Sequence, residues 1–443
     1  MIETVKDIII KKLKEYGIKK WDLFITKTYT VENQFRKTDI EITRDYELIE
    51  YVIRIFRDKE KKMGIGVVKG SSIEEQIISN TIKNASKIAE INSTVKYDLN
   101  PSGLKYKKLS LADKEIISNP FDFIYKVSDE LTTEILNNKG IQGTFGKFRV
   151  YIQDRRLINS VGLDIDSKTT FMYLEYALKA SKKGKLAEYW TKSYYKNAEL
   201  LKLPSRINLW ARIAEDTLNA IKPPFNKSAT VLFPPRVLKD AFRNTLGFHI
   251  TGKSVVEKIS KFKIGDTIAS EKFTMNDNGL LLNGMGTNSW DGEGTPQKIT
   301  PVIKNGKFNS RIYDIKHARL LDEHSTGNGI RTSEGSVENL FTNIEIDAGK
   351  IKLDEIISET SEGFLIEEFS WLNPNRITGD FGAEIRNGYI IKNGEISSPI
   401  KGGNISGNVF EMINNIENIS IEREFEENTL FPYIQFNNLI ISS

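Results

Sequence analysis

The side chains that most often carry hydrolytic or metal chemistry are few and scattered in this 443-residue chain. It has three histidines, His249, His317 and His324, and no cysteine. The chain therefore has no disulfide, no thiol nucleophile and no thiolate metal ligand. His317 and His324 are seven residues apart, about 10 Å along a helix, which is awkward for two ligands of one small ion. His317 could instead pair with Asp314, three residues earlier, as a structural contact.

Carboxylates offer candidates for general acid or base chemistry. They are Asp291, Glu293, Asp322, Glu323 and Asp380. No spacing among them singles out a catalytic pair, and acidic residues are common in turns. The simpler interpretation is that Asp291 caps its own turn and that Asp380 orders the loop before it. We find no nucleophile elbow, phosphate loop or dinucleotide-binding motif.

Two glycine-punctuated turns, residues 291–296 and 325–329, bracket most of these candidates. Between them, Asn305 and Gly306 separate two strand-like runs, which predicts a hairpin because both residues tolerate the positive φ of a type I′ turn. Apolar spacing predicts a helix over residues 314–321. The loop 325–329 offers many backbone N–H groups, suited to a sharp turn or to holding an anion or a peptide carbonyl.

The order of helix-like and strand-like segments predicts an α+β fold in two domains. Chain length and the Pro223-Pro224 pair, which prevents helix continuation, give an N-terminal domain of residues 1–222 and a β-rich domain of residues 223–443. The first would be an antiparallel sheet with packed helices. Helices are predicted at 2–16, 72–91, 121–136, 207–221, 236–246, 353–358 and 409–416. Strands are predicted at 21–30, 34–43, 50–57, 63–69, 141–159, 164–178, 185–195 and 229–233.

Composition excludes some classes of protein. No run of about 18 apolar residues is present, so no transmembrane helix and no membrane association are predicted. The N-terminus lacks the basic-then-apolar order of a signal peptide, which favours a cytoplasmic protein. The net charge is only +4, from 63 basic and 59 acidic residues. The two signs are mixed along the chain, which disfavours nucleic-acid binding.

Residues 283–332 resemble the TldD/PmbA family of metallopeptidases, some of which are labelled modulators of DNA gyrase. The matching residues are Asp291, Glu293, Gly294, Pro296, Tyr313, Asp314, Ala318, Arg319, Leu321, Ser325, Thr326, Gly327 and Asn328. Weaker landmarks, including the run at residues 378–381, extend the resemblance over nearly the whole chain. The substrate-binding candidates are Asp291, Glu293, Arg319, Ser325, Thr326, Gly327, Asn328 and Asp380.

The resemblance also implies where a metal would be bound. The family's catalytic branch carries an H-E-x-x-x-H motif on the helix after the first strand of the C-terminal domain, and a third ligand from a cysteine near the C-terminus. The matching positions here are Arg243, Asn244 and Phe248. A guanidinium has no lone pair for a cation, an amide cannot act as a base towards water, and a phenyl ring has no donor atom. We therefore expect no catalytic residue and no metal or other cofactor in this chain.

These departures resemble the PmbA (TldE) branch of the family. The resemblance implies a non-catalytic subunit of a cytoplasmic TldD–TldE-like zinc metallopeptidase acting on peptides or unfolded segments, with the zinc in a TldD-type partner. Residues 325–329 and nearby strands would hold extended substrate. Two alternatives stay open. One is a stand-alone homodimeric peptide-binding protein. The other is an independent hydrolase that uses Asp291, Glu293 or Asp380, with an unrecognised carboxylate or metal site.

Overall fold

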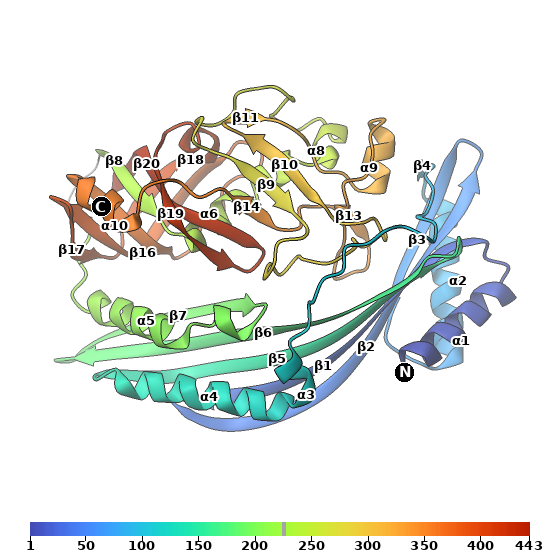
Figure 1. Ribbon diagram of the computed structural model, residues 1–443, viewed down its shortest axis with the longest axis horizontal. Helices are drawn as coiled ribbons and strands as arrows, with labels where there is room; N and C mark the ends of the chain where they lie inside the picture. Colours follow the sequence, from blue (N-terminus) through green and yellow to red (C-terminus); the bar gives the residue numbers. More distant parts are fainter. Residues whose placement is uncertain (224–226) are drawn as a thin grey trace.

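The computed structural model describes residues 1–223 and 227–443, and its N-terminal half is built on one strongly curved antiparallel sheet (Figure 1). The strand order is β4-β3-β2-β1-β5-β6-β7. The strands are β1 (Lys20–Arg36), β2 (Asp39–Lys59), β3 (Lys62–Gly70), β4 (Thr94–Val95), β5 (Ile141–Asn159), β6 (Asp164–Lys182) and β7 (Lys185–Tyr195). The long strands form a bent platform that lies below the C-terminal half in Figure 1.

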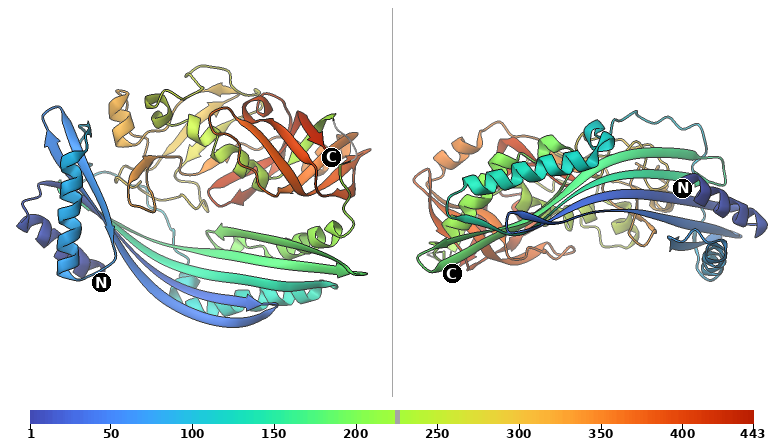
Figure 2. Two further views of the ribbon diagram at one scale, coloured as in Figure 1. Left: turned by 180° about the vertical axis from the view of Figure 1, so that it is seen from behind. Right: turned by 90° about the horizontal axis from the view of Figure 1, so that it is seen from below.

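Helices cover one face of this platform. They are α1 (Ile2–Glu15), α2 (Glu75–Ile91), α3 (Lys114–Ser118), α4 (Pro120–Asn137) and α5 (Leu203–Thr217), with a short 3-10 turn at Ala198–Leu200. Leu23 and Ile25 of β1 pack against α1 and α2, and Val31 packs in the core formed with α4 and α5. Alternate residues of a strand share a face, so both helix pairs lie on the same side, at opposite ends. Figure 2 shows α4 lying along the long strands, with α1 at the other end.

The C-terminal half contains a closed ring of strands. The ring consists of β8 (Lys227–Phe233), β15 (Glu362–Phe369), β16 (Asp380–Lys392), β18 (Asn404–Asn408) and β20 (Thr429–Ser442). It closes because β20 pairs with both β18 and β8. The helix α6 (Pro235–Arg243) follows β8 and buries Val237, Leu238, Ala241 and Phe242 in the main C-terminal core.

The remaining C-terminal elements extend or cover this ring. The strands are β9 (Met275–Asn278), β10 (Ile299–Lys304), β11 (Lys307–Phe308), β12 (Gly329–Arg331), β13 (Val337–Asn339), β14 (Ile344–Ile346), β17 (Glu395–Ile400) and β19 (Ile416–Glu426). The helices are α7 (Leu246–His249), α8 (Gly252–Val256), α9 (Ile315–Leu320), α10 (Leu353–Glu359) and α11 (Val409–Met412). Strands β14, β9, β10 and β11 continue the sheet from β20 in that order.

The predicted α+β class is confirmed, and so are β5 and β7, which span the predicted residues. The predicted break between residues 30 and 34 is wrong. There β1 continues to Arg36 and turns at Lys37, which adopts a positive φ of 58°. The helix predicted at 72–91 begins only at Glu75, because the Ser72 hydroxyl accepts a hydrogen bond from the Glu74 N–H before the first helical turn.

Several predicted boundaries also differ from the structure. The helix predicted at 207–221 spans residues 203–217, and the one predicted at 409–416 ends at Met412. The helix predicted at 236–246 ends at Arg243, and a separate short helix starts at Leu246. Residues 224–226 of the predicted domain boundary lie outside the described residues. Within the described residues, no helix is long and apolar enough to cross a membrane.

Candidate functional site

Both ends of the segment between residues 283 and 332 contact the N-terminal half, through Asn283, Glu293 and Arg331. Asn305 and Gly306 have φ of 48° and 75°, so the hairpin of β10 and β11 turns as predicted. Helix α9 is capped by Asp314, whose Oδ1 accepts a hydrogen bond from the His317 N–H at 2.6 Å. The same Oδ1 lies 2.7 Å from Nδ1 of His317. His317 is therefore held in a structural pair with Asp314.

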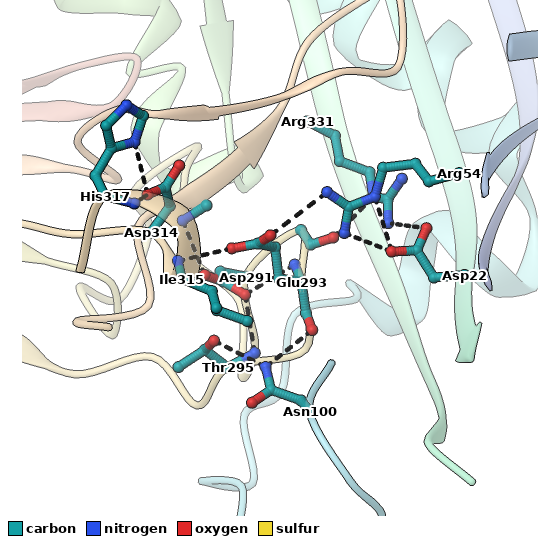
Figure 3. Close-up of polar contacts among 12 residues, drawn as sticks. Asp22, Arg54, Asn100, Asp291, Glu293, Thr295, Asp314, Ile315, His317 and Arg331 are labelled. Carbon is teal, nitrogen blue, oxygen red and sulfur yellow. Dashed lines mark hydrogen bonds and ion pairs between the residues drawn. The ribbon is translucent and has the colours of Figure 1, made fainter. Parts of the chain in front are cut away.

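Four buried charged side chains join the two halves, and we call them the interdomain charge network (Figure 3). Arg54 of β2 donates from Nε to Asp22 of β1 at 2.8 Å and pairs through Nη1 with Glu293 at 3.4 Å. Arg331 donates from Nη2 to the other oxygen of Asp22 at 2.9 Å. Each of the four side chains is at most 6% exposed. Two members come from each half, so the network fixes the domains against each other.

The network keeps one carboxylate charged and disfavours the charge of another. Burial alone would raise the pKa of Asp22, but Arg331 and Arg54 outweigh burial and hold it below its ordinary value. Burial raises the pKa of Glu293 despite the nearby Arg54 guanidinium. The pKa of Asp291 is also raised by burial, against three hydrogen bonds from backbone N–H groups. Glu293 and Asp291 are thus far less acidic than exposed carboxylates.

Asp291 organises the turn around it. Its Oδ1 accepts hydrogen bonds from the N–H groups of Glu293 and Thr295 at 2.9 and 2.8 Å, and its Oδ2 accepts one from Gly329 at 2.8 Å. The turn is also held from the N-terminal half, since Asn100 donates from Nδ2 to the Glu293 carbonyl at 3.0 Å. This geometry is that of a turn-capping aspartate.

The loop at residues 325–329 uses its own N–H groups. Those of Thr326 and Asn328 donate to the Tyr313 carbonyl at 3.0 and 3.3 Å. The Gly327 N–H donates to Oγ of Ser325 at 3.3 Å, and the Gly329 N–H to Asp291. The expectation of free N–H groups here is wrong, because those of residues 326–329 donate to Tyr313, Ser325 and Asp291 within the chain. The loop that contains Ser325, Thr326, Gly327 and Asn328 is therefore joined to Asp291 through Gly329.

Two of the candidates lie apart from this cluster. Arg319 is exposed on α9. Asp380 is exposed at the start of β16 and accepts a hydrogen bond from Nδ2 of Asn408 at 2.7 Å, while its N–H donates to Oγ1 of Thr378 at 3.3 Å. Asp380 and Asn244 line the same groove at the end of α6. Asp380 therefore lies in a different region of the molecule from Asp291 and Glu293.

The three positions matched to the metal motif do not fit zinc. Arg243 ends α6, and its Nη1 pairs with Glu427 at 3.1 Å. Asn244 donates to Asn373 at 3.5 Å, and the Phe248 ring lies 5.0 Å from the guanidinium carbon of Arg376. A cation, an amide and a phenyl ring cannot together bind a divalent metal. In the described part of the chain, no three histidine, aspartate or glutamate side chains are grouped to hold an ion.

A cleft of about 510 Å³ lies beside these positions, and we call it the α6 cleft. It is bounded by β7, α5, α6, β15 and the end of β19. Its carboxylates include Asp240, Glu368 and Glu426, and burial raises the pKa of each, that of Glu368 to about 7. Oε2 of Glu368 has no hydrogen-bond partner among the described residues. Sequence reasoning missed this cluster because its members lie far apart in the chain and form no motif.

Residues 226–443 match the family model described as the PmbA/TldA metallopeptidase C-terminal domain. A metalloprotease PmbA homolog of Buchnera aphidicola is 24% identical over 100% of this chain and 96% of its own length. The chain belongs to the TldD/PmbA family.

Two further proteins are similar to this chain over most of its length. A metalloprotease TldD homolog of Buchnera aphidicola is 26% identical over 388 residues, 84% of this chain and 75% of its own length. The crystal structure of TldE from Thermococcus kodakarensis has a TM-score of 0.87 and 22% identity, covering 99% of this chain and 100% of that one. This likeness shows that the whole chain, including the N-terminal sheet, has the fold of a TldD/PmbA family structure.

The first prediction concerns the interdomain charge network. Arg54→Met leaves Glu293 buried without its ion-pair partner and Asp22 with Arg331 alone, so we expect unfolding free energy to fall by about 3–5 kcal/mol. Arg36→Met is the control, since Arg36 is 77% exposed and pairs only with exposed Glu41. The Arg36→Met substitution should lower the unfolding free energy by less than about 1 kcal/mol. Urea denaturation followed by tryptophan fluorescence measures both, and equal losses would contradict the assigned role of the network.

The second prediction concerns the pH dependence of stability in the α6 cleft. Burial raises the pKa of Glu368 from the ordinary 4.5 to about 7, so the folded state binds this proton more tightly than the unfolded state. Its contribution to stability is therefore lost as pH rises from about 4.5 to about 7. Glu368→Gln removes this loss, so the variant should gain stability relative to the wild type across that window.

Urea unfolding at several values from pH 4.5 to 8 tests this expectation. Glu130→Gln is a suitable control, because Glu130 is exposed on α4. That variant should follow the wild-type curve at every pH. A stability difference between Glu368→Gln and the wild type that does not change with pH would show that Glu368 does not titrate in this window.

Proposed function

We propose that this chain is a non-catalytic, TldE-type subunit of a cytoplasmic metallopeptidase complex that acts on peptides or unfolded segments. The observation that carries the proposal is the side-chain chemistry at the end of α6. Arg243, Asn244 and Phe248 occupy the positions matched to the zinc motif, and their partners are Glu427, Asn373 and Arg376. The chain also has no cysteine to supply the third ligand that the resemblance implies. The zinc would then belong to a TldD-type partner.

The α6 cleft supports a role in holding an extended peptide. One wall of the cleft is β7, which pairs only with β6 among the described strands and so presents a free sheet edge. A peptide can add to such an edge through main-chain hydrogen bonds. The N–H groups of residues 326–329 are used within the chain, so β7 takes the place of that loop in this proposal.

Arg243 provides a charge beside this cleft. Its side chain is 37% exposed, and its partner Glu427 lines the cleft. A guanidinium can form two parallel hydrogen bonds with a carboxylate, so Arg243 could bind an acidic group of a peptide in the assembled complex. The proposal therefore assigns substrate capture, and no chemistry, to this chain.

Co-expression with a TldD-type chain of the same genome tests the proposal. We expect one species on size-exclusion chromatography, with a mass by light scattering that corresponds to a heteromer. Elemental analysis after zinc loading and removal of free metal should give close to zero zinc per copy of this chain when it is purified alone. The expected value in the complex is about one zinc per TldD-type chain.

Other results would contradict this function. Two separate species after co-expression would exclude the heteromeric complex, and a homodimer would favour a stand-alone peptide-binding protein. A tightly held zinc near one per copy of this chain alone would point to a metal site elsewhere in the protein. Peptide hydrolysis by this chain alone would support an independent hydrolase.

A second test addresses Arg243. Arg243→Ala should lower unfolding free energy by less than about 1 kcal/mol, because the ion pair with Glu427 is partly exposed. In the assembled complex the variant should bind an acidic peptide more weakly, measured by fluorescence anisotropy. Arg36→Ala on the N-terminal sheet is the matched control. Unchanged peptide affinity in both variants would show that Arg243 only fills space.

A further inference from the structure

Two cations of the N-terminal half, the half-buried Arg155 and the buried Lys196, have no carboxylate partner among the described residues. Lys196 follows β7 and is 8% exposed, and its Nζ donates to Oγ1 of Thr169. Arg155 of β5 donates from Nε to Oε1 of Gln153 at 2.5 Å. Neither side chain forms an ion pair with any described residue. The partners of both cations are neutral oxygen atoms.

The other described cations with buried side chains are either paired with a carboxylate or, like Arg311, donate to main-chain carbonyls. Arg54 and Arg331 share Asp22, and Arg236 pairs with Glu367. Without a carboxylate partner, Lys196 loses its proton more easily than an ordinary lysine, because burial and the nearby Arg155 lower its pKa to about 7. Burial also lowers the pKa of Arg155. Buried charges in proteins are normally paired or well hydrogen-bonded, and each of these two cations has only one hydrogen bond within the described chain, to a neutral oxygen, so the pair is a candidate anion site.

The two cations face a cavity that could hold such an anion. The cavity measures about 100 Å³ and lies between β5, β6 and residues 285–288 of the C-terminal half. Its lining includes hydrogen-bonding side chains, namely Gln153, Ser167, Thr169, Thr287 and Asn288. It has room for a carboxylate or a single phosphate beside Arg155 and Lys196, with polar side chains of both halves in its walls.

A larger cavity of about 370 Å³ adjoins the small one, and the two share Gln153, Arg155, Met285 and Asn288 as lining residues. Its walls are partly apolar, formed by Phe24, Val52, Trp290 and Ile330 among others. The other two cations of the larger cavity are already paired, Lys69 with Glu50 and Arg331 with Asp22. Arg155 is thus the one unpaired cation among the described residues that line it.

We propose that Arg155 and Lys196 bind the carboxylate of a ligand whose apolar body occupies the larger cavity. The C-terminal end of a peptide with an apolar last side chain has this chemistry. That choice of ligand rests on the proposed function, whereas the oxyanion site does not. Arginine suits the role because its planar guanidinium can donate two parallel hydrogen bonds to one carboxylate. The apolar walls favour a carboxylate carried on an apolar group over inorganic phosphate.

Isothermal titration of the full chain with three probes at constant ionic strength tests the proposal. The probes are N-acetyl-leucyl-phenylalanine, its C-terminal amide and inorganic phosphate. The acid should bind at least about tenfold more tightly than the amide, because only the acid supplies the charged acceptor. Arg155→Met and Lys196→Met should each weaken binding of the acid by about tenfold or more. Lys87→Met, at an exposed position of α2, should leave that binding unchanged.

A stability readout separates a binding lysine from a structural one. Lys196→Met removes an unpaired buried charge, so its melting temperature without ligand should equal or exceed that of the wild type. The variant should also lose the rise in melting temperature that the acid gives the wild type. A lysine needed only for its hydrogen bond to Thr169 would give a less stable variant that still binds the acid. Lys196→Gln serves the same purpose if the Met variant does not fold.

Several outcomes would overturn the proposal. Equal affinity for the acid and the amide would exclude a carboxylate site. Phosphate binding without binding of the acid would show a site for an inorganic ion instead. Unchanged binding of the acid by Arg155→Met and Lys196→Met would place the site elsewhere. Binding of the acid by a chain that forms no complex with a TldD-type partner would uphold this site and contradict only the proposed function.

Discussion

The buried contact of Arg54 with Asp22 and Glu293 is the interaction on which the arrangement of this molecule depends. It joins a strand of the N-terminal sheet to the acidic turn of the C-terminal half, in a place that water does not reach. The α6 cleft and the two smaller cavities are all lined by residues of both halves. Their shapes therefore follow from the angle at which this contact holds the sheet against the ring of strands.

The acidic turn shows how one loop can hold distant parts of a fold together. Asp291 binds the N–H groups of its own turn and of Gly329, and Glu293 reaches Arg54 and the N–H of Ile315 at the start of α9. The turn, α9 and the N-terminal sheet thus meet at two carboxylates. The sequence offers both carboxylates as candidate acids or bases, with turn capping as the simpler interpretation of Asp291, and the contacts of Asp291 are those of a capping residue. The unpaired cations Arg155 and Lys196 have no such explanation within the chain.

Much of the fold could be predicted from local patterns, and much of the site could not. Alternation of apolar residues gave β5 and β7, and Asn305-Gly306 gave its hairpin, because both signals depend on neighbours in the chain. The pairing of Arg54 with Glu293 spans 239 residues, and that of Asp22 with Arg331 spans 309. Strand periodicity tells which face a side chain occupies but not which distant residue it meets there. Lys196 carries no motif at all, and only its tertiary surroundings make it unusual.

The closed ring of strands in the C-terminal half has a consequence for the order of events during synthesis. Its first strand, β8, pairs with the last strand, β20, so that Lys227 lies opposite Ile441. The ring cannot close until residue 442 has left the ribosome, whereas the N-terminal sheet is complete after residue 195. Domains generally fold as units during synthesis, N-terminal first. The finished platform would then be present throughout translation of the second half, with the face that carries Phe24 and Val52 open until residues 285–335 cover it.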